Sequence, residues 1–383
     1  MVNKDLRFEP DYAIPPGETL LDTIEYLGMT QTELAERTGR PLKTISEIIN
    51  GKTAITPETA LQLERVLGIP AAFWNSLQRN YDELLERKRE RERLQQQTEW
   101  LKKIPVKELV KRGWIRGFED LVDQLQEVLN YFGVASIEAW SNVWQNVIES
   151  PAVAYRKSEA YKSELGAVAS WLRKGQIEAQ KIICKPFNES SFKDALKSIR
   201  ALTTTGPKTF VPEIQRLCAE VGVVVVFIPE LPKCRISGAT YWLSSDKAVI
   251  QLSLRYRTDD HLWFSFFHEA GHILLHGKRN LFLEYDNEES KQEEEEEANR
   301  FAANILIPAA RFNHFVKRGS FNVFTIKQFA EELGIAPSIV VGRLQHEKII
   351  PYRTRLNFFK KHFNGLCDYT LYSPAAVTYY QQD

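Results

Sequence analysis

Two histidines and a glutamate within one short stretch have the types and spacing of a metal-dependent hydrolase. His268 and His272 stand four residues apart, and Glu269 follows the first, inside the apolar run WFSFFHEAGHILLHG. On a helix of 3.6 residues per turn both imidazoles lie on one face and reach a single Zn²⁺. Glu269 is then placed to act as the general base on a metal-held water. The alternative is a helix that carries two histidines and binds no metal. It is disfavoured because the helix is expected to be buried, and burying unpaired imidazoles and a carboxylate costs free energy.

A catalytic zinc needs a third protein ligand and one open position. The acidic run 293–297 offers five glutamates. The expected helix over this segment has an apolar stripe of Ala298, Phe301, Ala302 and Ile305. Residues three, four or seven positions earlier lie on the same face of the helix, which leaves Glu294 and Glu295 as the two candidates. The other glutamates are expected on a solvated face. We interpret His276 as a histidine that supports the site from outside, because on an unbroken helix it lies a further ~6 Å along the axis.

The elements expected to position these residues are a small sheet and two helices. Apolar and β-branched stretches predict three strands over 221–228, 239–243 and 248–254. Helices are expected over 259–276, which carries the histidines, and over 292–306, which carries the glutamates. Residues 325–345 have the helix and turn pattern of another helix-turn-helix. Their mostly apolar side chains favour a place in the domain core over DNA contact.

The stretches HEAGHILLHG and EEEANRFAANILIP resemble the ImmA/IrrE family of metallopeptidases, which are cytoplasmic proteases that cleave repressor proteins. The resemblance runs from about residue 222 to 345 and implies a gluzincin-like α+β fold. It also implies that the third zinc ligand is Glu295, four residues before Asn299 in an E-x-x-A-N pattern. The implied substrate is a repressor or antitoxin-like protein, this chain or its homologue included.

The N-terminal region predicts consecutive short helices separated by glycines. Thr30 and Glu33 form a capping box for a helix that Gly39 ends, and Pro41 begins a second helix that stops at Asn50. Two helices joined by so short a turn make a helix-turn-helix. Residues 15–82 resemble the DNA-binding domain of HigA-type antitoxins, which implies a homodimer on a double-stranded DNA operator.

The second helix of this pair has the residue types that contact a DNA groove. A buried stripe of Leu42, Ile45 and either Ile48 or Ile49 is expected. Between residues 37 and 52 four Lys or Arg residues face one Glu, a local net charge of +3. The candidate DNA contacts are Arg40, Lys43, Thr44, Ser46, Glu47, Asn50 and Lys52.

The length of 383 residues favours several domains. We expect an all-α helix-turn-helix domain over 1–83, a helical spacer over 84–205, the metallopeptidase domain over 206–350 and a C-terminal tail over 351–383. Lys and Arg balance Asp and Glu at 50 each, so nucleic-acid binding requires a local patch. The chain shows no signal peptide, no membrane-spanning run and no CxxC pair among its four cysteines, which favours a reducing cytoplasm without membrane attachment.

These features predict a DNA-binding transcriptional regulator fused to a zinc-dependent endopeptidase that cleaves a repressor or antitoxin-like protein. The alternative is an antitoxin or repressor whose zinc domain is a sensor or protein-docking module without significant turnover. Cys234, in the loop before the strand expected nearest to the metal helix, could occupy the open zinc position as a regulatory thiolate. An inert loop cysteine is the favoured interpretation.

Overall fold

The computed structural model describes residues 14–145, 165–234, 236–253, 258–276, 282–285 and 293–362. It divides into two compact units, Met1–Glu99 and Trp100–Asp383. No helix of the described part of the chain is long and apolar enough to span a bilayer.

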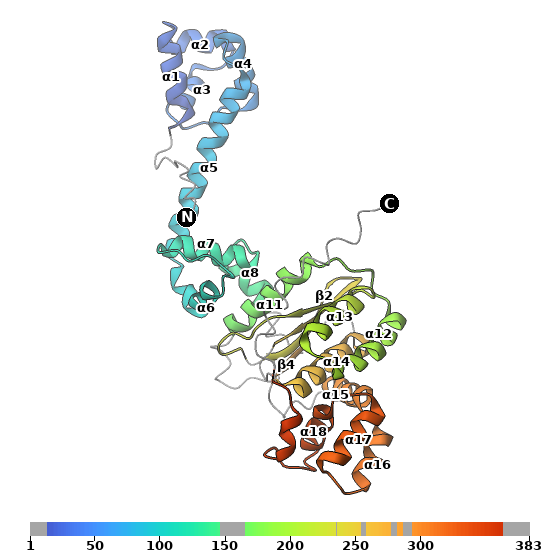
Figure 1. Cartoon of the computed structure of the whole chain (residues 1–383). Helices are drawn as coiled ribbons and strands as arrows, with labels where there is room; N and C mark the ends of the chain where they lie inside the picture. The colour runs from blue at the N-terminus through green and yellow to red at the C-terminus, as the bar shows by residue number, and fades with distance from the viewer. Residues whose placement is uncertain are drawn as a thin grey trace. The chain divides into compact units, whose positions relative to one another are not determined.

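In residues 14–99, the described part of the N-terminal unit, the regular elements are all helices, as expected (Figure 1). Thr30 caps the second helix by accepting a hydrogen bond from the Glu33 amide at 3.1 Å, and Gly39 ends it with a left-handed φ of 69°. A Cβ at Gly17 would lie 2.5 Å from the Ile49 carbonyl oxygen, so this glycine lets the first helix approach the third closely. The helices are α1 (Pro16–Tyr26), α2 (Gln31–Thr38), α3 (Leu42–Ile49), α4 (Pro57–Leu67) and α5 (Ala71–Gln95).

The C-terminal unit is built on a mixed sheet with the strand order β1-β3-β2-β4. Strands β1 (Val223–Phe227) and β3 (Lys247–Leu252) are parallel, whereas β2 (Ile236–Ser244) runs antiparallel to both β3 and β4 (Phe282–Tyr285). The α+β class is confirmed, and all three expected strands are present. β4 is not among the expected strands and is only four residues long.

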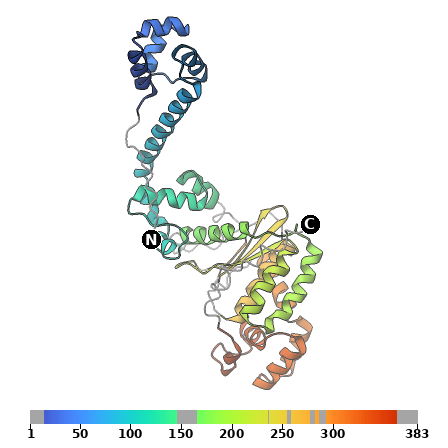
Figure 2. The ribbon, with the colours of Figure 1, turned by 45° about the horizontal axis from the view of Figure 1, so that its top comes forward.

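Helices cover both faces of this sheet (Figure 2). The main core joins alternate residues of β1 and β3 to α12 (Glu189–Ala201), α13 (Pro207–Ala219) and α14 (Asp259–Leu275). On the other face α11 (Leu165–Lys181) contacts three strands, and its Trp171 Nε1 donates to the Ile228 carbonyl oxygen at 2.9 Å. The η4 turn (Leu202–Thr204) joins α12 to α13.

The expected spacer boundaries differ from the observed elements. The boundary at 83/84 falls inside α5. The helix continues past it because charged side chains three and four residues apart stabilise an exposed helix without packing against a core. The boundary at 205/206 separates α12 from α13, although their apolar faces share the main core with the sheet. Between α5 and residue 145, where the described part of this segment ends, the helices are η1 (Thr98–Lys103), α6 (Val106–Lys111), α7 (Leu121–Phe132), α8 (Ile137–Trp140) and η2 (Ser141–Gln145).

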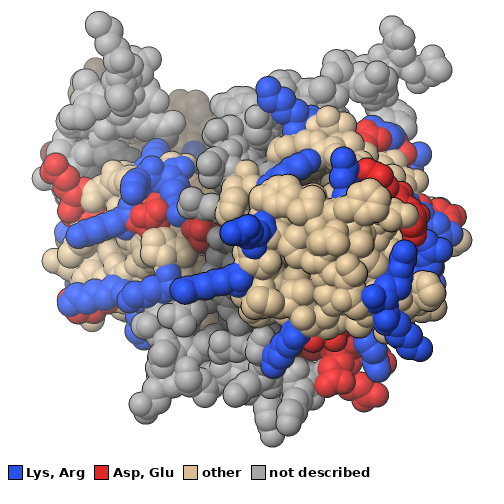
Figure 3. All heavy atoms as spheres, turned by 60° about the horizontal axis from the view of Figure 1, so that its bottom comes forward, with Lys and Arg blue, Asp and Glu red and all other residues tan. Residues whose placement is uncertain are grey.

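After α15 (Glu293–Leu306) the chain forms a basic helical lobe of α16 (Ala309–Lys317), α17 (Val323–Leu333), α18 (Pro337–His346) and η5 (Arg355–Phe359). Residues 308–362 hold ten Lys or Arg and three Glu, a net charge of +7, and Figure 3 shows the cations around an uncharged surface. Most of α18 is buried and it contacts α14, as the apolar pattern of 325–345 predicts. Residues 363–383 of the expected tail lie outside the described residues.

Candidate metal centre

Three buried side chains converge at the centre of the C-terminal unit. The Nε2 atoms of His268 and His272 lie 3.0 Å apart, and the two carboxylate oxygens of Glu295 lie 3.3 Å and 3.7 Å from them. All three side chains are at least nine-tenths buried. A tetrahedral zinc with bonds of about 2.0–2.1 Å holds its ligand atoms about 3.4 Å apart, so this donor set fits the ion in both chemistry and spacing. Within the described residues, these three form the only such group of metal-binding side chains.

Close packing of two helices brings the glutamate to the histidines. A Cβ at Gly271 would lie 3.2 Å from the Ala298 Cα and from the Phe301 ring, so only small residues permit this approach of α14 to α15. Glu295 precedes that contact by one helical turn and is 7% exposed. Glu294, the other candidate from the apolar stripe, is half-buried and lies outside the group.

The outer nitrogens of both imidazoles have protein partners. His268 Nδ1 lies 2.9 Å from Asn299 Oδ1, and His272 Nδ1 lies 2.9 Å from His276 Nδ1. His276 in turn lies 3.3 Å from Glu297 Oε2. A proton on each Nδ1 leaves both Nε2 lone pairs available to a metal.

These contacts place His276 beside a candidate ligand, as expected of a supporting residue, and Glu297 beside His276. His276 follows the last residue of α14 and faces the outer nitrogen of His272. The Glu297 side chain is 41% exposed, in agreement with the expected solvated face, and its carboxylate also reaches His276. Helical spacing predicts the direction of each Cβ atom, but it does not predict how far a long side chain such as glutamate reaches across the helix surface.

Glu269 lies at the same centre, pressed between α14 and β2. It is completely buried, and the Thr240 hydroxyl donates to its Oε2 at 2.5 Å. A Cβ at Gly238 would lie 2.9 Å from Glu269 Cγ and would overlap its carboxylate. Gly238 and Thr240 share one face of β2 because they are two residues apart. Neither residue is among the predicted site residues, although two small residues at period two in a strand are a sequence signal for such a close contact.

Cys234 is buried, with 3% exposure, but it does not belong to the group formed by His268, His272 and Glu295. Arg235, which follows it, lies outside the described residues. The cysteine therefore stays interpreted as a loop residue.

The predicted DNA contacts occupy different environments on the helix-turn-helix. The Arg40 side chain is only 18% exposed, because its Nε donates to Gln62 Oε1 at 2.5 Å and its Nη2 pairs with Glu58 at 3.1 Å. Both partners belong to α4, so Arg40 joins α4 to the turn.

The Lys43 side chain is 85% exposed, and its Nζ lies 3.8 Å from Glu47. Asn50 and Lys52 are exposed, whereas Thr44, Ser46 and Glu47 are half-buried. The expected buried stripe of α3 needs one correction, since Leu42 is 46% exposed while Ile45, Ile48 and Ile49 are buried. Leu42 is the first residue of α3 and stands outside the unit's core.

Comparisons with known proteins match both parts of the chain. The model of the IrrE N-terminal-like domain, a peptidase family, matches residues 218–345, and a helix-turn-helix model matches residues 26–74. Virulence-associated protein A of Dichelobacter nodosus is 39% identical over 71 residues, which are 18% of this chain and 70% of that protein. The uncharacterized HTH-type transcriptional regulator YddM of Escherichia coli is 32% identical over 63 residues, which are 16% of this chain and 67% of that protein.

A solved structure of an addiction module antidote protein of a HigA family from Coxiella burnetii is 32% identical; the match covers 22% of this chain and 92% of that one, with a TM-score of 0.21. The family models and the curated relatives agree with the two resemblances found in the sequence. The chain therefore belongs to the helix-turn-helix transcriptional regulators through its N-terminal domain, which is fused here to an IrrE N-terminal-like domain of the metallopeptidase family.

Proposed function

We propose that this protein is an operator-binding regulator whose C-terminal unit is a zinc endopeptidase for a repressor or antitoxin-like protein, its own kind included. The observation that carries the proposal is the convergence of His268, His272 and Glu295 beside the buried carboxylate of Glu269. The match of residues 218–345 to a peptidase family supports the same reaction class.

The donor set assigns a distinct task to each residue. His268, His272 and Glu295 hold the zinc ion, while Asn299 and His276 keep the two imidazoles in the required tautomer. When bound, the ion supplies a Lewis acid that polarises the scissile carbonyl and lowers the pKa of water at the site. Glu269 accepts the proton of the attacking water and returns it to the leaving amine nitrogen. Thr240 fixes the direction of that carboxylate.

The sheet offers a place for an extended substrate. In the described part of the chain β4 lies at the sheet edge, paired only with β2. An edge strand leaves backbone donors and acceptors available to a further strand, so a substrate segment can pair there by backbone hydrogen bonds. Such pairing accepts many sequences, which suits a protein substrate whose selection depends on docking elsewhere.

The test compares fragment formation by the full-length protein and two glutamine variants. Zinc-loaded protein is incubated alone and with the products of neighbouring genes, and fragments are identified by mass spectrometry. Glu269→Gln should keep one zinc per chain and produce no fragments, whereas Glu296→Gln, an exposed glutamate of the same acidic run, should behave as the parent. Absence of fragments from the parent in every mixture would refute the peptidase and favour a sensor or docking module.

The metal assignment is tested separately from turnover. The double variant His268→Ala, His272→Ala removes two of three proposed ligands, so it should lose stoichiometric zinc. Metal content is measured after dialysis, with His314→Ala, a histidine of α16 outside the group, as the control. Zinc retained at one per chain in the double variant contradicts the assignment whatever the activity.

For the N-terminal unit we propose a homodimer on a palindromic operator with α3 in the major groove and half-sites about 10 base pairs apart. The exposure of Lys43 at the start of α3 supports this orientation. Lys43→Ala should weaken binding and lower the slope of log affinity against log salt by about 1, as expected for one phosphate contact. Arg65→Ala, which removes the same charge from α4, should change neither. Equal effects of the two variants would argue against groove contact by α3.

A further inference from the structure

Unpaired cations gather on the segment 346–362, which follows α18 in the basic helical lobe. The segment holds five Lys or Arg residues and one glutamate. Glu347 pairs with Arg343 at 2.8 Å and Lys360 pairs with Asp260 at 2.6 Å, so Glu347 is not available to the other four cations. Those four are exposed, and within the described part of the chain none has a carboxylate partner. We call them the basic strip: Lys348, Arg353, Arg355 and Lys361.

Exposed cations on other helices of the chain are neutralised by nearby acids. Arg87 of α5 pairs with Glu83 at 2.7 Å, and Lys193 of α12 pairs with Glu189 at 2.6 Å. Pairs three or four residues apart are the ordinary arrangement on an exposed helix. In contrast, residues 348–361 contain no acid at all. Like charges repel one another, so the basic strip is not an ordinary solvated surface and favours an anionic partner.

Hydrogen bonds hold the backbone of the strip in one conformation. The buried Gln345 Nε2 donates to the Tyr352 carbonyl oxygen at 3.1 Å and to Asn357 Oδ1 at 2.9 Å. At the end of the strip the Lys361 amide donates to Asp259 Oδ1 at 2.9 Å, at the start of the metal-bearing helix. The cations are therefore carried by a fixed surface, and binding does not require the segment to become ordered.

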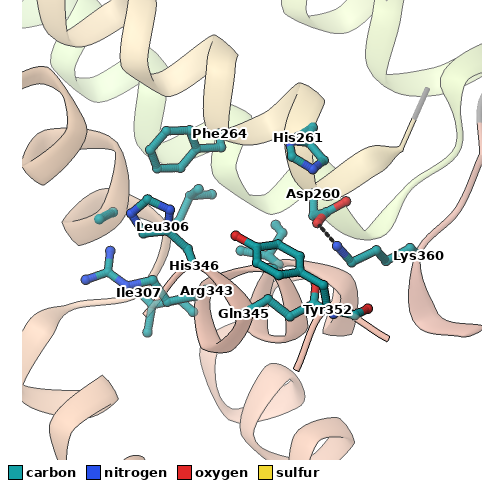
Figure 4. Close-up of a pocket in the computed structure, with 13 residues that line it drawn as sticks. Asp260, His261, Phe264, Leu306, Ile307, Arg343, Gln345, His346, Tyr352 and Lys360 are labelled. Carbon is teal, nitrogen blue, oxygen red and sulfur yellow. Dashed lines mark hydrogen bonds and ion pairs between the residues drawn. The ribbon is translucent and has the colours of Figure 1, made fainter. Parts of the chain in front are cut away.

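The inner side of the same segment faces α14 and α18 (Figure 4). There Tyr352 and Lys360 line a cavity of about 120 Å³ beside Phe264. None of the four cations of the basic strip lines this cavity. Because they are exposed instead, they are available to a large partner outside the domain.

The positive charge continues over the rest of the lobe. Lys317, Arg318 and Lys327 are also exposed and have no carboxylate partner among the residues that the structure describes. Figure 3 shows the Lys and Arg side chains spread around an uncharged surface. Together with the basic strip they make seven unpaired cations on one helical lobe.

We propose that this lobe, with the basic strip at its centre, binds the phosphate backbone of double-stranded DNA without sequence preference. A duplex carries one negative charge per about 1.7 Å of its axis, so several exposed cations meet phosphates at once without an exact geometric match. An acidic protein is disfavoured because its carboxylates must be matched to the positions of the cations. The contact uses the exposed segment and not α18, most of which is buried.

The helix-turn-helix domain of the same chain supports DNA as the partner. A chain bound to DNA through one domain has a raised effective concentration of DNA around its other domain. The lobe therefore needs only weak affinity to contribute. This second DNA contact does not depend on peptidase activity.

Lysine footprinting of the full-length protein tests the contact residue by residue. The protein is treated with acetic anhydride with and without a duplex of scrambled sequence and about 30 base pairs, roughly three helical turns. Acetylation is then measured by mass spectrometry. With the duplex in excess of its Kd, acetylation of Lys348 and Lys361 should fall about threefold or more. That of Lys193 and Lys197, both on α12, should stay unchanged.

A charge variant tests the same contact by its salt dependence. The strip variant is Lys348→Gln, Arg353→Gln, Arg355→Gln, Lys361→Gln. Because up to four phosphate contacts are lost, the slope of log affinity against log salt should fall by about 3–4, and affinity at about 100 mM salt should fall tenfold or more. A control variant with the same change in charge should alter neither quantity. It replaces exposed cations of α12 and α13: Lys193→Gln, Lys197→Gln, Lys208→Gln, Arg216→Gln.

The melting temperature and zinc content of both variants report whether they fold. Protection of the two strip lysines, with a lower slope in the strip variant alone, supports the proposal. Unprotected Lys348 and Lys361 at saturating duplex overturn it, as do equal losses of affinity in the two variants. Poly-glutamate that protects these lysines as well as the duplex does, at equal charge concentration, also overturns it and assigns the strip to an acidic protein. Cleavage of a substrate enters neither measurement.

Discussion

Replacing Thr240 by Val tests how the proposed general base is held. Valine has nearly the shape of threonine but no hydroxyl, so Thr240→Val removes the donor that lies 2.5 Å from Glu269 Oε2. Both residues are at most 1% exposed, so water cannot take the place of the lost hydroxyl. A hydrogen bond to a charged group contributes about 1.5–3 kcal/mol, and this is the expected fall in the free energy of unfolding.

The C-terminal unit can be followed selectively in the full chain. Of the eight tryptophans seven lie beyond residue 99, so tryptophan fluorescence reports mainly on this unit. At about 2–4 °C per kcal/mol, Thr240→Val should lower the melting temperature by roughly 3–12 °C. Thr240→Ser keeps the hydroxyl and loses one methyl group, so it should cost only about 0.8 kcal/mol.

A double-mutant cycle with Glu269→Gln separates the charged hydrogen bond from packing. Against a neutral amide the same hydroxyl contributes about 0.5–1.5 kcal/mol, so Thr240→Val should cost about 1 kcal/mol less in that background. If Val and Ser at 240 destabilise the protein equally, or if the loss is the same in both backgrounds, the hydroxyl does not hold the carboxylate. Under the proposed function, Thr240→Val also slows cleavage while zinc stoichiometry stays at one.

Three further variants test other contacts. Gly17→Ala should destabilise the N-terminal unit by at least about 1–3 kcal/mol and abolish operator binding in a gel-shift assay, because its Cβ would lie 2.5 Å from the Ile49 carbonyl oxygen. Gly271→Ala should weaken zinc binding about tenfold in chelator competition, since the helix bearing Glu295 must shift. Burial raises the pKa of Asp259, so this carboxyl stabilises the fold at low pH and loses that contribution as pH rises through its folded pKa. The melting temperature of the parent relative to Asp259→Asn should therefore fall as the pH rises above about 4, the ordinary pKa of an aspartate, and a difference independent of pH would contradict this.

Features of short range could be predicted from the sequence because their physics is local. The interval between His268 and His272 follows from one turn of helix, and the cap at Thr30 with the left-handed Gly39 follows from adjacent backbone groups. The strands follow from β-branched and apolar patterns, and the family resemblance implies the α+β class. The same reasoning narrowed the third ligand to Glu294 or Glu295, and the family resemblance favoured Glu295.

Contacts between distant segments depend on the tertiary structure. Thr240 meets Glu269 only because β2 pairs with β3 in one register and α14 crosses that face; a slip of one residue would turn Thr240 away. The approach of Glu295 to the histidines depends on the fit of Gly271 against Ala298, which no periodicity within either helix contains. The cavity beside Phe264 likewise arises where three helices and the segment to Lys360 meet. Periodicity indicates which face of an element is buried, but the partner of that face is decided by packing the whole chain into one core.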